Sequence, residues 1–165
     1  MNKILSILLI LIVFPTVTFA QDRAPYMLKS KENTELQKLL LRFDSLLQIN
    51  KSVDSGAKLG EVEEDVGCSI RLTKKNGLYH SIYFNEVMKI DGTKIELKKL
   101  DQVYPELIRK QDSTHTFYLA NSYLIDIETI SEVMKLDSGT GVDVIIRVGS
   151  KAGVTVEKGY QYCGC

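Results

Sequence analysis

The chain has 165 residues, of which 44% are hydrophobic and 25% are charged, with 21 Lys and Arg residues against 21 Asp and Glu residues. This balance is typical of a globular domain and excludes an intrinsically disordered, collagen-like or coiled-coil chain. Because the formal net charge is zero, the chain offers no basic field to a phosphate backbone, and we expect no nucleic-acid partner.

The first twenty residues have the three parts of a secretory signal peptide. Lys3 supplies the positive start, an apolar run follows over 4–14, and Thr18-Phe19-Ala20 ends in a small residue. We expect cleavage after Ala20, which leaves a single domain over 21–165 in the periplasm or outside the cell. The alternative is an uncleaved membrane anchor, although the apolar run is only about half of the roughly 20 residues that span a bilayer.

Export makes the three cysteines candidates for a disulfide. Cys68 lies in an expected strand, whereas Cys163 and Cys165 end the chain. We expect Cys68 to pair with one of these two and to hold the tail against the domain. The alternative is a redox or metal pair formed by the two terminal cysteines, but zinc usually takes four ligands and the chain has no further cysteine. We therefore expect no metal and no cofactor.

Residues 34–48 predict an N-terminal amphipathic helix, which Asn33 or Thr34 can cap. Its apolar residues share one helical face and are Leu36, Leu39, Leu40, Phe43, Leu46 and Leu47. We expect this face to pack on a sheet, with a partner-binding helix as the alternative. The acidic segment 52–65 predicts a solvated loop, because its acids lack the fixed oxygen spacing of a calcium loop.

Alternating apolar and polar residues on both sides of Asn76-Gly77 predict a β-hairpin. A second helix is predicted over 97–110, after a capping-box spacing at 93–96, and Pro105 should kink or restart it. Residues 114–120 are rich in β-formers and predict a strand.

Residues 126–136 predict a third helix, capped by Asp126 and carrying apolar residues at helical spacing. The aliphatic run 142–148 predicts a buried central strand, and 154–162 predicts an antiparallel strand that returns beside it. Together these elements predict an α/β (α+β) fold, a layered mixed sheet of about five strands with two or three helices packed on it.

The sequence contains no recognisable catalytic motif, and we expect no catalytic residue. His80 and His115 fall on strand faces that are otherwise apolar, and no local motif supplies the partner that a catalytic histidine needs. We expect both to be core or edge residues. Several tyrosines could form a sugar or peptide platform, although exposed tyrosines are ordinary on a sheet; these are Tyr79, Tyr83, Tyr104 and Tyr118.

The second half of the chain resembles the periplasmic domain of the ExbD/TolR family over roughly 68–148. The resemblance rests on Thr116 to Ser122, the continuation through Ile125 to Glu128, Glu132-Val133-Met134 and Gly141-Val142. In that family a strand leads into a helix that often contains Glu-Val-Met, and a glycine followed by an aliphatic residue opens the last strand. The resemblance therefore also implies a helix over 126–136.

Members of this family are energy-coupling proteins of the bacterial inner membrane, and a single Asp in their transmembrane helix takes part in a proton-driven motor. The segment 4–20 contains no acid, so the motor residue is missing and no functional residue can be carried over. A second likeness is to the plug domain of outer-membrane receptors, which would make 131–136 a strand instead of a helix.

These observations predict an exported, non-enzymatic binding module of a bacterial envelope, similar to the ExbD/TolR soluble domain. Its expected partner is an envelope protein or a cell-wall component, and a homodimer is one possible assembly. Membrane contact is expected only if the N-terminal segment stays uncleaved. The competing hypothesis is a small secreted hydrolase or redox protein that uses His80 or His115 with a terminal cysteine. A histidine within hydrogen-bond reach of a thiol or carboxylate inside a pocket would favour this competitor.

Overall fold

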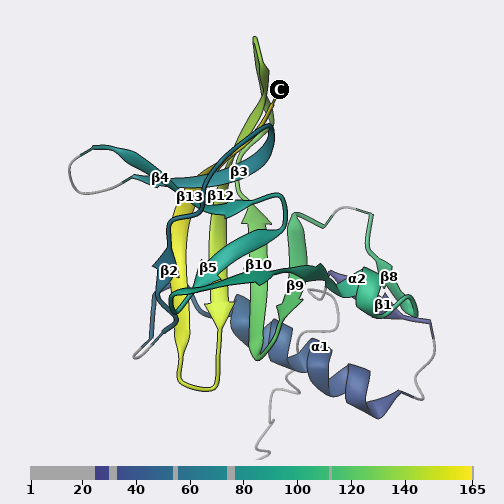
Figure 1. Ribbon diagram of the computed structural model, residues 1–165. Helices are drawn as coiled ribbons and strands as arrows, with labels where there is room; N and C mark the ends of the chain where they lie inside the picture. Colours follow the sequence, from purple (N-terminus) through teal and green to yellow (C-terminus); the bar gives the residue numbers. More distant parts are fainter. Residues whose placement is uncertain (1–24, 30–32, 54–55, 74–76, 112, 165) are drawn as a thin grey trace, which may run out of the picture.

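The computed structural model describes residues 25–29, 33–53, 56–73, 77–111 and 113–164 (Figure 1). Of these residues, 53% lie in strands and 14% in helices. The predicted α/β (α+β) fold is therefore wrong. The described chain forms one curled antiparallel sheet of eleven strands, close to a half-barrel, in place of a mixed sheet of about five strands. The expected signal peptide over 1–20 lies outside the described residues.

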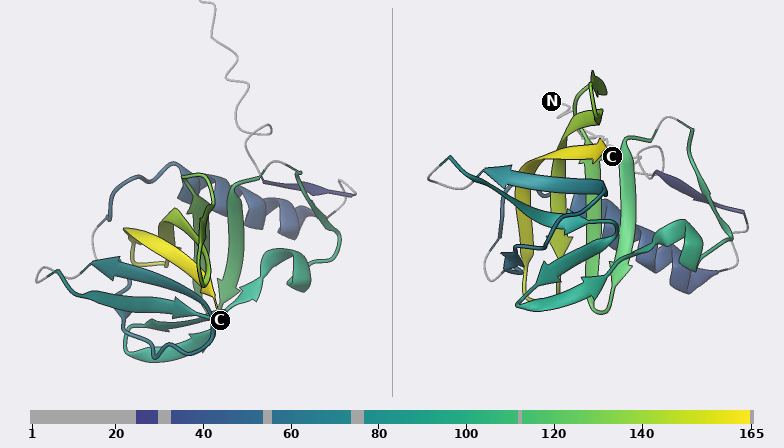
Figure 2. Two further views of the ribbon diagram at one scale, coloured as in Figure 1. Left: turned by 90° about the horizontal axis from the view of Figure 1, so that it is seen from above. Right: turned by 45° about the horizontal axis from the view of Figure 1, so that its top comes forward.

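The strands of the large sheet are short at its edges and long at its centre. In chain order they are β2 (Leu59–Gly60), β3 (Gly67–Thr73), β4 (Tyr79–Phe84), β5 (Val87–Ile90), β6 (Thr93–Glu96), β7 (Lys98–Lys99), β9 (His115–Ala120), β10 (Tyr123–Thr129), β11 (Met134–Leu136), β12 (Gly139–Gly149) and β13 (Val154–Gly164). Their spatial order is β2-β5-β4-β3-β13-β12-β10-β9-β7, while β6 pairs with β5 and β11 pairs with β12. Figure 2 shows how this sheet curls around its own inner face.

Two helices and a small second sheet complete the described fold. Helix α1 (Thr34–Leu47) confirms the prediction for 34–48, and the Asn33 side chain caps it by accepting a hydrogen bond of 3.0 Å from the Leu36 amide. Strand β1 (Tyr26–Leu28) pairs with β8 (Leu107–Arg109), and α2 (Leu100–Val103) is a single turn. None of the described helices is long and apolar enough to cross a membrane.

The sheet has an apolar core on each of its two faces. The inner core fills the concave side, where Val144, Ile146 and Val148 of β12 project toward side chains of β3 to β6. The outer core lies under α1, which packs against β10 and β12. Here Phe43 of α1 stacks on Phe117 of β9 with ring centroids 4.2 Å apart. The predicted packing of α1 on a sheet is thus confirmed.

The helix predicted over 126–136 is wrong, because this segment is extended in β10 and β11. Strand β10 is buried on both faces, with Ile125 and Ile127 in the inner core and Leu124 and Asp126 on the other side. A strand buried on both faces lacks polar alternation, so its apolar run can match a helical period. The helix that the ExbD/TolR resemblance implied here is therefore not formed.

The helix predicted over 97–110 is also wrong. It is divided into β7, the short turn α2 and β8, and the capping-box segment 93–96 forms strand β6. Pro105 lies between α2 and β8, where its missing amide proton removes a helical hydrogen bond. The hairpin prediction is confirmed, since β3 and β4 pair antiparallel on either side of 74–78.

The predicted disulfide is confirmed as Cys68–Cys163. The two residues face each other in the register between β3 and β13, so the bond joins neighbouring strands that are 95 residues apart in sequence. Cys165 lies outside the described residues. A disulfide is typical of an oxidising, exported compartment.

Candidate functional site

Two adjoining hollows lie on the outer face of the sheet, where β4, β3, β13 and β12 run side by side. Their volumes are about 440 Å³ and about 670 Å³, and Arg71 and Tyr79 line both of them. We call their union the outer groove. Its lining residues are Glu61, Val62, Glu63, Glu64, Arg71, Thr73, Tyr79, His80, Ser81, Ile130, Asp143, Val144, Lys158, Gly159 and Tyr160.

Strand register places the polar side chains of the outer groove in one row. Arg71 of β3 is opposite Tyr160 of β13 and, on its other side, opposite Ser81 of β4. Tyr160 is in turn opposite Asp143 of β12. Directly paired residues project from the same face of a sheet. The row therefore runs across four strands, on the face opposite the inner core.

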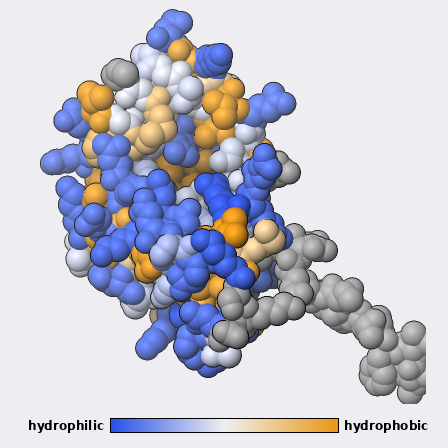
Figure 3. All heavy atoms as spheres, turned by 90° about the vertical axis from the view of Figure 1, so that its right-hand side faces the viewer, coloured by the Kyte–Doolittle hydropathy of each residue, from blue (hydrophilic) through white to orange (hydrophobic). Residues whose placement is uncertain are grey.

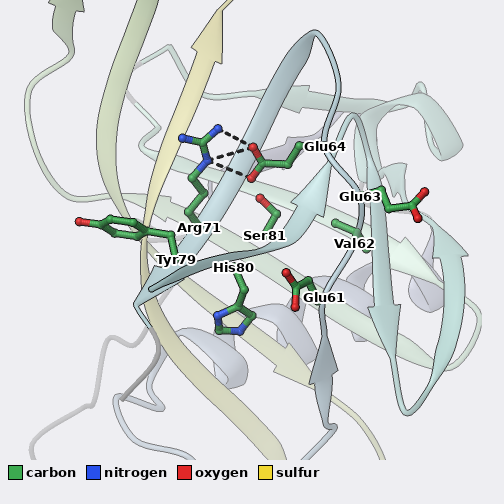
Figure 4. Close-up of a pocket in the computed structure, with 8 residues that line it drawn as sticks. All are labelled: Glu61, Val62, Glu63, Glu64, Arg71, Tyr79, His80 and Ser81. Carbon is green, nitrogen blue, oxygen red and sulfur yellow. Dashed lines mark hydrogen bonds and ion pairs between the residues drawn. The ribbon is translucent and has the colours of Figure 1, made fainter. Parts of the chain in front are cut away.

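An ion pair between Arg71 and Glu64 occupies the centre of the outer groove (Figure 4). The Arg71 Nε donates to both Glu64 oxygens, at 2.9 and 3.1 Å, and Nη2 makes a further contact with Oε2. This hydrogen bonding raises the pKa of Arg71 above its usual value. The guanidinium also lies 5.3 Å from the centre of the Tyr162 ring. The charge of Arg71 is thus held in a fixed orientation.

Ser81 is a buried polar residue beneath this ion pair. Its side chain and backbone are only 3% exposed, and among the described residues its hydroxyl has no hydrogen-bond partner. His80 also has an unpartnered nitrogen, Nδ1. Figure 4 shows the two side chains on opposite sides of β4, so they do not form a Ser–His catalytic pair. Because this hydroxyl is enclosed, a bound ligand can satisfy it only when the side chains above it move aside.

Tyrosine rings form the apolar part of this face. The Tyr160 ring lies over Gly141 of β12, where a Cβ atom would overlap its hydroxyl. The Tyr162 hydroxyl donates to the Ser138 carbonyl at 2.9 Å, which holds that ring along the strands. Tyr79 is 68% exposed at the rim. The outer groove therefore combines aromatic surface with fixed charges.

The tyrosine platform predicted from sequence is largely not formed. Only Tyr79 of the four lines the outer groove, whereas Tyr83 and Tyr118 face each other in the inner core with their hydroxyl oxygens 3.5 Å apart. Burial raises the pKa of both phenols. Tyr104 packs against the outer core. Sequence alternation identified strand positions, but the curl of the sheet decided which face was enclosed.

His115 lies in a second polar site, which sequence reasoning missed. The side chains of His115, Asp126, Glu128 and Arg147 meet on β9, β10 and β12, and we call them the His115 cluster. His115 Nδ1 is 2.9 Å from Asp126 Oδ1, and Arg147 Nη1 is 2.7 Å from Asp126 Oδ2 and 2.8 Å from Glu128 Oε2. Asp126 was expected to cap a helix; instead the register places it opposite Arg147 and next to His115.

The His115 cluster borders a hollow of about 350 Å³ at the C-terminal end of α1. His115 therefore meets the criterion that favours the competing enzyme hypothesis, a histidine bonded to a carboxylate in a pocket. Of the two terminal cysteines that hypothesis could use, Cys163 is bonded to Cys68 and borders a different hollow, and Cys165 lies outside the described residues. The described lining of the histidine hollow also contains no hydroxyl or thiol; it consists of Asp44, Leu47, Gln48, Asn50, His115, Glu128 and Arg147.

Comparison of the chain with protein-family models, with curated proteins and with solved structures finds no match.

Proposed function

We propose that the protein is an exported, non-enzymatic binding module that holds a neutral glycan of the cell wall in the outer groove. The N-terminal signal pattern and the Cys68–Cys163 disulfide support an exported location. The observation on which the binding proposal rests is the buried, unpartnered Ser81 hydroxyl in a groove that also contains fixed charges and tyrosine rings.

The charges of the outer groove favour a neutral ligand over a polyanion. Two bases line it, Arg71 and Lys158, and the four acids are Glu61, Glu63, Glu64 and Asp143. The formal balance is 2 − 4 = −2, which repels phosphate or carboxylate polymers. Sugar rings offer an apolar face for stacking on tyrosine and a rim of hydroxyls that both donate and accept hydrogen bonds. The groove supplies tyrosine rings for the apolar face of the sugar and charged side chains for its hydroxyls.

The exposed Tyr79 ring provides the first test of glycan binding. Tyr79→Ala removes one stacking surface, worth about 0.5–1.5 kcal/mol, and should weaken binding of oligomers of N-acetylglucosamine by up to about tenfold. Isothermal titration calorimetry measures the affinity. The matched control is Leu78→Ala, which truncates a neighbouring exposed side chain and should leave the affinity unchanged. Absence of binding to the unaltered protein, or equal loss in both variants, would contradict the proposal.

One observation favours a second function, hydrolysis by an activated water at His115. The Asp126 carboxylate holds the imidazole in one orientation inside a hollow, as general-base catalysis requires. Such an activity would disappear in His115→Gln and persist in His80→Gln. Release of soluble fragments from cell-wall glycan by the unaltered protein, measured over time, would support this function; unchanged glycan would exclude it for that substrate.

A further inference from the structure

The segment 61–66 borders the outer groove and is fixed to the sheet near its two ends. It joins β2 to β3 and contains no helix or strand. Near one end, the Val62 amide donates a hydrogen bond of 2.8 Å to the Ser81 carbonyl. At the other end, the Val66 carbonyl accepts a bond of 3.3 Å from the Asn85 side chain. We call this segment the acidic strap, because four of its six residues are Asp or Glu.

A single ion pair holds the middle of the acidic strap against the sheet. In the described part of the chain, Glu64 is the one residue of 63–65 that bonds to the rest of the protein, and its partner is Arg71 of β3. Glu63 and Asp65 on either side of it are exposed. Whether the middle of the acidic strap lies on the groove therefore depends on this one contact.

The ion pair covers the Ser81 hydroxyl. Strand register places Arg71 directly opposite Ser81 on one side, and Val62 of the acidic strap lies beside Ser81 on the other side (Figure 4). The Arg71–Glu64 pair joins these two neighbours above the hydroxyl. The Arg71 and Glu64 side chains are 37% and 28% exposed, whereas Ser81 is 3% exposed. A ligand in the groove therefore meets the ion pair before it meets Ser81.

Glu64 is the partner that can move away, because Arg71 is held by a second contact. The Arg71 guanidinium lies 5.3 Å from the centre of the Tyr162 ring, and its backbone belongs to a strand that is paired on both sides. Separation of the pair would leave Arg71 in place with N–H groups free to donate to sugar hydroxyls. It would also uncover Ser81.

We propose that the Arg71–Glu64 ion pair is an autoinhibitory contact, which keeps the outer groove closed over Ser81 until the acidic strap moves away. This inference rests on the proposed glycan binding and adds its regulation. The apparent affinity of a ligand falls with the fraction of molecules in the binding-competent state. Any change that weakens the ion pair should therefore tighten glycan binding. A neutral glycan has no charge of its own, so the ion pair is the source of any difference in salt dependence.

Glu64→Gln tests this contact directly, because it removes the charge and keeps the size of the side chain. Isothermal titration calorimetry with an N-acetylglucosamine oligomer should show binding about two- to fivefold tighter than in the unaltered protein. The matched control is Asp65→Asn, which removes one charge from an exposed neighbour that does not line the groove and should leave the affinity unchanged. Thermal unfolding shows whether both variants are folded.

Salt provides a second measurement, which also uses the unaltered protein. Raising sodium chloride from about 0.05 M to about 0.5 M screens an exposed ion pair and should tighten binding to the unaltered protein more than binding to Glu64→Gln. Unchanged or weaker affinity in folded Glu64→Gln, equal tightening in Asp65→Asn, or equal salt effects in the unaltered protein and Glu64→Gln would overturn this inference alone. Absence of binding to both of these proteins would overturn the proposed glycan binding as well.

Discussion

Ser81 and Asp44 are polar groups that the fold encloses without satisfying them. The Ser81 hydroxyl and one Asp44 oxygen have no hydrogen-bond partner among the described residues, and each borders a hollow. Enclosing such a group costs about 1–3 kcal/mol. A protein under selection for stability alone would replace it with a smaller or apolar residue. The Ser81 hydroxyl is the reason that the proposed glycan site is placed in the outer groove.

Ser81→Ala should weaken glycan binding without destabilising the protein. Loss of the unpartnered hydroxyl should leave the free energy of unfolding unchanged or raise it by up to about 1 kcal/mol, whereas glycan affinity should fall because the ligand loses a hydrogen bond. Chemical denaturation and calorimetry measure the two quantities. A destabilised variant with full affinity would show that the hydroxyl has an undetected structural partner.

Asp44→Asn should stabilise the protein at neutral pH. Burial raises the pKa of Asp44, so the folded state resists ionisation and stability is lost as pH rises from the usual Asp range through the raised folded value. The amide cannot ionise and avoids this loss. Melting temperatures should therefore differ between the two proteins at pH 7 and converge near pH 3. A lower melting temperature for the variant at pH 7 would contradict the account.

At the scale of elements, sequence patterns identified α1 and the buried strand over 142–148 but misread β10 as part of a helix. Helix α1 has one apolar face and one polar face, and its bounds were predicted closely. Strand β10 is enclosed by both cores, so no alternation marked it as a strand. The His115 cluster was missed for the same reason, since Asp126 was assigned to a helix. Arg71 was visible only as a polar residue of an alternating strand, and its partner Glu64 comes from a different segment.

Two isoleucines on either side of the end of β10 test the corrected assignment. Ile127 is 6% exposed in the inner core, whereas Ile130 is 46% exposed. Ile127→Asp should unfold or strongly destabilise the protein by burying a charge, while Ile130→Asp should cost much less. Thermal unfolding measures both. The helix predicted over 126–136 would have made both substitutions severe, so comparable severe losses would contradict the strand.

At the scale of the whole molecule, the curl of the sheet separates two kinds of surface. The concave side is filled by the inner core, whereas the convex side is covered by α1 only in part. The view in Figure 3 shows hydrophobic side chains interspersed with hydrophilic ones. The uncovered part of the convex side holds the outer groove, and the end of α1 borders the His115 cluster. Neither position follows from local sequence, because both depend on strand order.

The disulfide should stabilise this arrangement by restricting the unfolded chain. It closes a loop of 95 residues, for which chain entropy predicts a contribution of about 4–5 kcal/mol. Replacing both Cys68 and Cys163 with alanine should lower the free energy of unfolding by a corresponding amount, which chemical denaturation measures as a lower midpoint. The molecules that remain folded should still bind glycan. An unchanged midpoint would show that the neighbouring strands need no covalent bond.

The most direct test of glycan binding in the outer groove is a nuclear magnetic resonance titration of the isotope-labelled protein with a soluble N-acetylglucosamine oligomer. The account predicts saturable shifts of backbone and side-chain signals at Arg71, Tyr79, Ser81 and Tyr160, with signals of the inner core unchanged. Shifts confined to other surfaces, or no shifts at millimolar oligomer, would contradict the assignment of the outer groove as the glycan-binding site.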